Sequence, residues 1–257
     1  MNEELVEQLK NMEGKVSFIY KDLSSREMIS YQEDMKMKAA SIIKIPIMVE
    51  VFRQIESGRL NKHQTYCLKE EDKRPSCGAL NMMHAGVELT ILDLCNLMII
   101  LSDNTATNIL IGLMGMEQIN HSMKDLGLQV TKVNRLLFDR EASAKGIENY
   151  VSASEIAGLL EKMYQGTLVS KGASAKMLDI LKQQRLNGKI PFHFVEKIEV
   201  AHKTGEDDGI THDVGIVYGK SPFLVCFLGN EVDVPAFERF MQDTTLKLLQ
   251  YSEEDKI

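Results

Sequence analysis

The stretch AASIIKIPIMVEVFRQIESG, residues 39–58, places a serine and a lysine together at the start of an apolar helix. Residues three apart on a helix share one face, so the amine of Lys44 can reach the hydroxyl of Ser41. An amine that is partly desolvated or lies near another cation has a lowered pKa and can accept the serine proton. The N–H groups at a helix start can stabilise an oxyanion beside the serine. The pair therefore predicts a serine nucleophile activated by a lysine.

Two further motifs strengthen this prediction, because S-x-x-K alone occurs about once by chance in a chain of this size. The stretch LSDNTATN places SDN at residues 102–104, between two predicted helices. The stretch HKTGED places KTG at residues 203–205, at the end of a predicted strand. All three motifs in this order arise by chance in roughly one of several thousand such chains. The sequence therefore favours a functional origin for the set.

The elements that must position these motifs change character along the chain. Residues 2–12 favour an amphipathic helix, and residues 15–32 alternate like a hairpin with a Ser-Ser turn. Residues 41–186 carry helical signals, among them a Thr90 cap and a capping box formed by Ser152 and Glu155. The middle of the chain is therefore predicted to be almost entirely helical.

After NGKIPF the hydrophobic period returns to that of strands, at residues 197–205, 212–219 and 222–230, and an amphipathic helix follows. Two isolated strands cannot bury an apolar face, so we expect one five-stranded antiparallel sheet formed from both chain ends. The fold class is therefore α/β (α+β), with residues 1–257 as a single domain. Its expected α/β subdomain is formed by residues 1–40 plus 187–257, and residues 41–186 form an inserted all-helical subdomain. The site is expected in a cleft between them.

With these three motifs the chain resembles the penicillin-recognising serine hydrolases, and among them the class A β-lactamases. The resemblance covers nearly the whole chain and implies the β-lactamase/transpeptidase-like fold. It also implies hydrolysis of a β-lactam amide through an acyl-enzyme on Ser41. Two alternatives stay open: a related peptidase, esterase or amidase that acts on another small acyl substrate, and a sensor that binds a β-lactam without turnover.

The resemblance implies a role for each residue of the first two motifs. Ser41 would be the acylated nucleophile, and Lys44 would be its proton-handling neighbour. Ser102 would pass a proton to the departing β-lactam nitrogen, and Asn104 would hydrogen-bond the side-chain amide of the substrate.

The third motif would bind the substrate and its oxyanion. The resemblance implies that Lys203 and Thr204 hold the substrate carboxylate, and that Gly205 lets the acyl group pass close to the strand. The backbone N–H groups of Ser41 and Glu206 would form the oxyanion hole. An anionic substrate needs a cation in the cleft, and Lys203 supplies one in an otherwise acidic chain.

The resemblance also implies a deacylating glutamate on an omega loop, followed by a proline and, three residues beyond it, by an asparagine. The corresponding stretch here is NRLLFDREASAKGIENY. Glu141 is the preferred interpretation, although Ala142 and Lys145 stand where the proline and the asparagine are expected. Asp139 and Glu148 are the competing carboxylates.

Other arrangements of nucleophiles and ligands have weaker support. His212 and Asp213 could form a triad with Ser41, but the serine already has a lysine partner, so a structural role is favoured. His202 should lie on the opposite face of its strand from Lys203, which favours a packing role.

The sequence predicts no metal and no cofactor. The zinc-ligating residue types in the first third of the chain have no common zinc-site spacing; they are His63, Cys67, Cys77 and His84. Four cysteines in 257 residues indicate free thiols in a reducing compartment, with a bridge between Cys67 and Cys77 as the alternative.

The composition limits the range of partners. With 37 acidic and 30 basic residues the formal net charge is −7, which argues against nucleic acid. No stretch reaches the ~20 apolar residues of a membrane span, which argues against a membrane role. A small-molecule substrate is expected, and the oligomeric state is left open. The start MNEELVEQLKNMEGK lacks the features of a signal peptide. This predicts a cytoplasmic location for the chain as written, or export if a leader was removed before this numbering begins.

Overall fold

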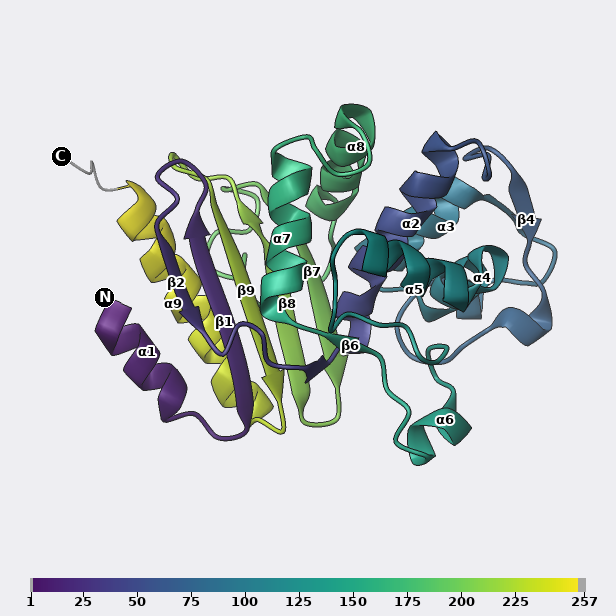
Figure 1. The fold of residues 1–257 in the computed structure, drawn as a ribbon. Helices are drawn as coiled ribbons and strands as arrows, with labels where there is room; N and C mark the ends of the chain where they lie inside the picture. The colour runs from purple at the N-terminus through teal and green to yellow at the C-terminus, as the bar shows by residue number, and fades with distance from the viewer. Residues whose placement is uncertain (1, 254–257) are drawn as a thin grey trace.

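Strands from both ends of the chain form one five-stranded antiparallel sheet in the computed structural model, which describes residues 2–253 (Figure 1). The strands are β1 (Lys15–Asp22), β2 (Met28–Tyr31), β7 (Val200–Asp207), β8 (Ile210–Val217) and β9 (Phe223–Asn230). Their order is β2-β1-β9-β8-β7, so the N-terminal hairpin joins the C-terminal strands where β1 pairs with β9. The predicted sheet and fold class are confirmed.

Both faces of this sheet are buried, and successive residues of each strand alternate between them. On β9, Leu224 and Cys226 belong to one hydrophobic cluster, whereas Phe223 and Val225 belong to another. Helices α1 (Asn2–Lys10) and α9 (Val234–Glu253) contribute to the second cluster, and α7 (Ala153–Tyr164) contributes to the first. Figure 1 shows α7 and α9 on opposite faces of the sheet. This double burial explains why β9 reads as a continuous apolar run.

The cluster that includes Leu224 continues into the helices beside the sheet. These helices are α2 (Lys44–Glu56), α3 (Ile91–Ile100), α4 (Asn104–Met114), α5 (Met116–Asp125) and α8 (Lys171–Lys182). Helix α2 is buried along almost its whole length. Because α7 contacts β1, β8 and β9 as well as α8, it joins the sheet to the helical part. The proposed division into two subdomains stays a prediction.

Two helix N-caps that were predicted from the local sequence can be compared with the structure. Thr90 caps α3 in a complete capping box with Asp93. Ser152 caps α7, but the predicted capping box is wrong. The carboxylate of Glu155 instead accepts hydrogen bonds from the backbone N–H groups of residues 129–131, in the loop after α5. Three donors satisfy a carboxylate better than one, so a tertiary contact displaces the local one.

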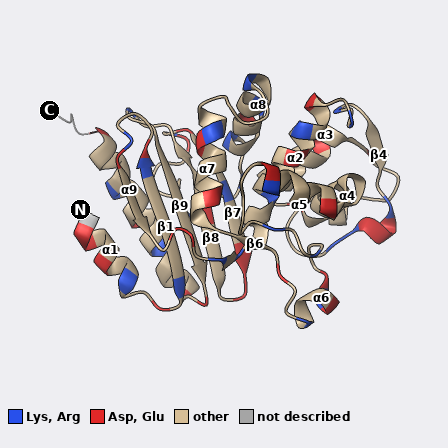
Figure 2. Cartoon of the chain, in the orientation of Figure 1, with Lys and Arg blue, Asp and Glu red and all other residues tan. Residues whose placement is uncertain are grey.

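Short elements that the sequence did not predict complete the chain. Strand β3 (Met37–Lys38) pairs with β6 (Tyr150–Val151), and β4 (Thr65–Cys67) pairs with β5 (Glu88–Thr90). The short helices are η1 (Ala40–Ile43), η2 (Glu70–Asp72), η3 (Leu80–Met82) and α6 (Arg140–Ala144). Acidic and basic residues are interspersed over helices and strands (Figure 2). Within residues 2–253, no helix combines the length and apolarity needed to cross a bilayer.

Close packing of α9 on the sheet depends on Gly229 of β9. A Cβ atom at this position would lie 2.6 Å from Cε1 of Phe237. The substitution Gly229→Ala should therefore lower the free energy of unfolding by about 1–3 kcal/mol, because the ring and its helix must shift. The control Gly158→Ala lies on α7, where a Cβ meets open space, and should raise it by up to about 1 kcal/mol. Urea unfolding measures both changes, and equal changes would contradict this packing.

Candidate active site

The candidate nucleophile lies in a 3-10 turn and not in the first turn of α2. Ser41 belongs to η1, and the α-helix begins at Lys44. A 3-10 helix has 3.0 residues per turn, which places residues i and i+3 directly above one another. Lys44 Nζ accordingly lies 2.9 Å from Ser41 Oγ. The turn is entered through Ala40, whose φ of 41° is disfavoured for a residue with a Cβ and indicates a backbone held by its surroundings.

Lys44 is fully buried and surrounded by oxygen atoms. Besides Ser41 Oγ, its Nζ donates to the carbonyl oxygen of Ser102 at 2.7 Å and to Asn104 Oδ1 at 2.8 Å. It also lies 3.0 Å from Ser102 Oγ. Burial lowers the pKa of Lys44 well below its ordinary value, and the charge of Lys203 lowers it further. The arrangement favours a neutral amine that can accept the proton of Ser41.

The SDN motif connects α3 to α4 and fixes the neighbouring loop. Ser102 adopts a left-handed conformation with φ of 53°. The Oδ1 atom of Asp103 caps α4, and Oδ2 accepts from the backbone N–H groups of Ala79 and Leu80 at 2.7 and 2.9 Å. Gly78 permits this approach, since a Cβ there would lie 2.3 Å from the Asp103 carboxylate carbon. Asp103 therefore holds the loop that borders the site.

The KTG motif brings a second buried lysine to the same serine. Lys203 Nζ donates to Ser102 Oγ at 3.0 Å and to the carbonyl oxygen of Thr204 at 2.8 Å. Burial lowers the pKa of Lys203 to about 7, and the negative charge of Asp213 partly opposes this shift. Ser102 Oγ thus contacts both lysines, which makes it a route for a proton between the nucleophile and the strand.

The end of β7 lies directly against the turn that carries the nucleophile. A Cβ on Gly205 would lie 3.3 Å from the backbone nitrogen of Ser41 and 3.1 Å from Cγ1 of Ile42. The glycine therefore permits this approach of strand to turn. The next residue, Glu206, pairs its carboxylate with the buried Lys189, whose Nζ lies 2.6 Å away. Glu206 directly follows Gly205 and lines the same cleft as Ser41.

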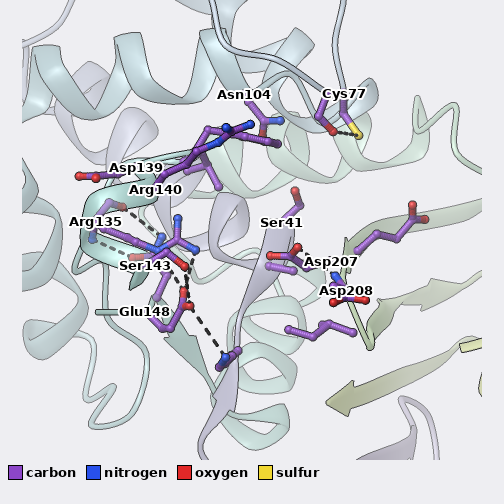
Figure 3. Close-up of a pocket in the computed structure, with 18 residues that line it drawn as sticks. Ser41, Cys77, Asn104, Arg135, Asp139, Arg140, Ser143, Glu148, Asp207 and Asp208 are labelled. Atoms are coloured by element: carbon purple, nitrogen blue, oxygen red, sulfur yellow. Dashed lines mark hydrogen bonds and ion pairs between the residues drawn. The ribbon is translucent and has the colours of Figure 1, made fainter. Parts of the chain in front are cut away.

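Ser41 opens into a cleft of about 660 Å³. Figure 3 shows it between two walls. One wall carries Arg135, Asp139, Arg140, Ser143 and Glu148, and the other carries Asp207 and Asp208. Asn104 and Cys77 lie at one end. Hydrogen bonds of Lys44 and Lys203 thus bring residues of all three motifs together, and Ser41 and Asn104 themselves line the cleft.

The structure does not bring Glu141 to this cleft. Its side chain is exposed on α6 and is not among the residues that line the cleft. Asp139 caps α6 through the N–H group of Ala142, which sets the helix so that residue 141 faces solvent. The two competing carboxylates do line the cleft, but Glu148 is paired with Arg135 at 2.6 Å. The assignment of Glu141 as the deacylating base therefore has no support from its position.

Two residues that sequence reasoning missed occupy this region. Asn108 lies one helical turn after Asn104 on α4, so the two side chains share a face. Its Nδ2 donates to the carbonyl oxygen of Leu137 at 2.9 Å, and its Oδ1 accepts from the Leu137 N–H at 2.8 Å. Leu137 is thereby clamped in the wall of the cleft with 9% of its surface exposed. The asparagine four residues after the SDN motif was the available signal.

The histidine alternatives are accounted for by other contacts. His212 donates from Nε2 to the carbonyl oxygen of Lys38 and accepts at Nδ1 from the N–H of Gly229, and burial lowers its pKa to about 4. Both ring nitrogens are occupied, so it cannot act as a base for the nucleophile. His202 is buried, which agrees with its predicted packing role, and its ring also bonds Asp213 at 2.9 Å and Asn187 at 3.0 Å.

The cysteines and potential metal ligands form no further centre. All four cysteines carry free thiols, so Cys67 and Cys77 are not bridged. Among residues 2–253, no three potential histidine, cysteine or carboxylate ligands lie together in a group that could hold a metal ion.

A serine in contact with a buried lysine, at the junction of a helical cluster and an antiparallel sheet, is the arrangement expected of the serine hydrolases to which the three motifs pointed. A family model described as "Beta-lactamase enzyme family" matches residues 1–251. The chain belongs to the Beta-lactamase enzyme family.

Curated relatives and solved structures agree with this membership. The chain is 25% identical to "Beta-lactamase L2" of Stenotrophomonas maltophilia over 67% of its own length and 57% of that protein. It is 24% identical to "Beta-lactamase 3" of Bacillus cereus over 86% of its length and 71% of that protein. For the first two curated relatives, the match thus spans little more than half of the relative.

Among solved structures, a β-lactamase from Sphaerobacter thermophilus DSM 20745 superposes with a TM-score of 0.88 at 30% identity. The superposition covers 97% of this chain and 96% of that one. The structure of PBP-A superposes with a TM-score of 0.89 at 24% identity over 98% and 96% of the two chains, and so supports the fold.

The depressed pKa of Lys203 makes a prediction for stability. Because the unfolded chain binds this proton up to a pH near 10.5 and the folded chain releases it near 7, the folded state is stabilised as the pH rises between these values. The stability of the wild type relative to Lys203→Met should therefore increase by about 1 kcal/mol per pH unit between pH 7.5 and 9. Urea unfolding at both pH values measures this.

The control for this comparison is Lys176→Met, at an exposed position on α8, whose stability difference from the wild type should not change with pH. A pH-independent difference for Lys203→Met as well would show that the folded chain keeps the ammonium charged.

Proposed function

We propose that this chain is a serine hydrolase that β-lactams, or related small acyl substrates, acylate at Ser41. The observation that carries the proposal is the 2.9 Å contact between Ser41 Oγ and the fully buried Nζ of Lys44. Among the described residues, the hydrogen bonds of this amine go to hydroxyl, carbonyl and amide oxygens and not to a carboxylate. The nearby charge of Asp103 acts to raise the pKa of this amine, but burial and the charge of Lys203 lower it more.

Acylation follows from these contacts. The neutral amine of Lys44 accepts the proton of Ser41, and Oγ attacks the carbonyl carbon of the substrate. The backbone N–H groups of Ser41 and Glu206 would stabilise the oxyanion that forms. When the carbon–nitrogen bond breaks, the departing nitrogen takes a proton from Ser102 Oγ, which the ammonium of Lys44 replaces. The proton thus returns along the contacts that the structure shows.

Substrate binding would use the ends of the same motifs. Lys203 and the hydroxyl of Thr204 would hold a substrate carboxylate beside Ser102. Asn104 accepts from Lys44 through Oδ1, and its Nδ2 donates one hydrogen to the carbonyl oxygen of Pro75 at 3.4 Å. The second Nδ2 hydrogen would bind an amide carbonyl of the substrate. Two fixed points on either side of Ser41 would orient the reactive carbonyl, and orientation of this kind is a large part of catalysis.

Release of the acyl group has less support from the geometry. Glu148 is engaged by Arg135 and Ser143, and Asp139 caps α6. Leu137 lies in the same wall, with its backbone held by Asn108. Its side chain is apolar and can neither hydrogen-bond nor deprotonate a water molecule. We infer that deacylation is slow and that the acyl-enzyme accumulates. A similar solved structure, that of a PBP-A variant, is an acyl-enzyme complex with penicillin G, which supports acylation by a penicillin on this fold.

Rapid β-lactamase turnover is the second candidate function. The curated relatives carry the name β-lactamase, and Asp139 and Glu148 both line the cleft. Turnover would require one of these carboxylates to leave its present partner and to bind a water molecule beside the acyl group.

The proposal predicts a covalent adduct with a chromogenic cephalosporin. The intact mass of the protein should rise by one acyl group and stay raised after the free reagent is removed. Ser41→Ala should show no adduct, whereas the control Ser143→Ala, which alters another hydroxyl that lines the cleft, should still be acylated. Fast colour change without a lasting adduct would favour the β-lactamase, and neither signal would contradict both functions.

A carboxylate in place of Leu137 should allow the acyl-enzyme to turn over. In Leu137→Glu, the new side chain enters the cleft beside the acyl group and can act as a general base on water, so the adduct should decay at least about tenfold faster. The time course of intact mass after acylation measures this rate. The control Leu113→Glu adds the same charge at an exposed position on α4 and should leave the rate unchanged. Equal rates in the two variants would contradict the placement of Leu137.

A further inference from the structure

We infer that Phe138 is a specificity-determining residue that selects acyl groups with an aromatic side chain. The inference rests on the proposed function, because it concerns the group that is transferred to Ser41. The loop before α6 forms one wall of the cleft. This loop carries Leu137 and Phe138 next to each other.

The exposure and backbone of Phe138 are unusual for an aromatic residue. Its side chain is 40% exposed although it lines a cleft. Its φ of 62° lies in the left-handed region, which residues with bulky side chains rarely adopt. Glycine would satisfy this backbone without strain. Disfavoured conformations of this kind are retained where the surroundings impose them, and they cluster at ligand sites.

The contacts on both sides of Phe138 show what imposes this conformation. Before it, Asn108 holds both the N–H and the carbonyl group of Leu137. After it, Asp139 caps α6 through the N–H of Ala142. The backbone is thus fixed at both neighbours, and the ring is presented at the mouth of the cleft instead of packing into the core.

The position of Phe138 places its ring on the side of the cleft that would receive the acyl side chain of the substrate. Asn104 and Asn108 are four residues apart on α4, so their side chains share a face about 5–6 Å apart. Asn104 would bind the amide of the acyl group, and Asn108 holds Leu137. A substituent that extends from that amide along α4 therefore runs toward Leu137 and Phe138, and away from Lys203.

The chemistry of the two walls favours an apolar substituent on this side. The opposite wall carries Asp207 and Asp208, and two charged groups on the wall of the ring, Arg135 and Glu148, are already paired with each other. Leu137 is only 9% exposed, so Phe138 supplies more of the accessible apolar surface here. An aromatic ring attracts another ring beyond the contribution of buried area.

The test compares two penicillins that share the nucleus and the amide and differ only in the acyl group. One carries phenylacetyl, as in penicillin G, and the other carries acetyl. Intact mass at increasing times gives the second-order rate constant of acylation of Ser41 for each. In the wild type the phenylacetyl compound should react faster, and Phe138→Ala should reduce its advantage roughly three- to tenfold, with little change for the acetyl compound.

Two variants separate recognition from a structural role. Phe138→Tyr keeps the ring and should retain the preference. Phe192→Ala removes an aromatic side chain that is 51% exposed and does not line the cleft, and should also retain it. An equal fall of both rates in Phe138→Ala, or an unchanged ratio, would overturn the inference but leave the proposed function intact. Absence of acylation by either penicillin in the wild type would overturn both.

Discussion

The burial of one lysine amine beside one serine hydroxyl is the constraint on which the rest of this structure depends. Removal of Lys44 from water disfavours its charged form, and Lys203 adds a second cation that opposes it. Such a site is stable only if every polar atom in it has a partner. The oxygen atoms of Ser41, Ser102 and Asn104 satisfy this requirement, and they come from two separate parts of the chain, the turn before α2 and the connection from α3 into α4.

The fold supplies these oxygen atoms through several unusual backbone positions. Ala40 and Ser102 both adopt left-handed conformations next to the amine, and Gly205 allows β7 to approach the 3-10 turn. The left-handed conformations of Ala40 and Ser102 have an energetic cost, and the close approach at Gly205 leaves little room for a side chain. They are maintained because α2 is buried in the core and β7 is paired with β8 along its whole length. The stability of the sheet and the helices thus stabilises the reactive geometry.

Much of the fold could be predicted because its signals are periodic. Both faces of β9 are buried, and the alternation of the N-terminal hairpin needs a partner sheet, so chain ends far apart in sequence had to meet. The capping box at Glu155 failed for an equally physical reason. Its carboxylate found three backbone donors in a loop that lies near it only after folding. A local pattern can be displaced by a tertiary contact that satisfies more groups.

For the candidate site, the sequence by itself predicted the acylation chemistry that we propose. The types and order of the three motifs fixed which serine, lysine and asparagine side chains could act together, because that chemistry depends on residue identity. Only the tertiary structure decided which side chains would stand beside the proposed acyl group. The clamp of Asn108 turns Leu137 into the cleft and leaves Glu141 in solvent, since two backbone hydrogen bonds fix the path of a loop whose own sequence has no periodic signal.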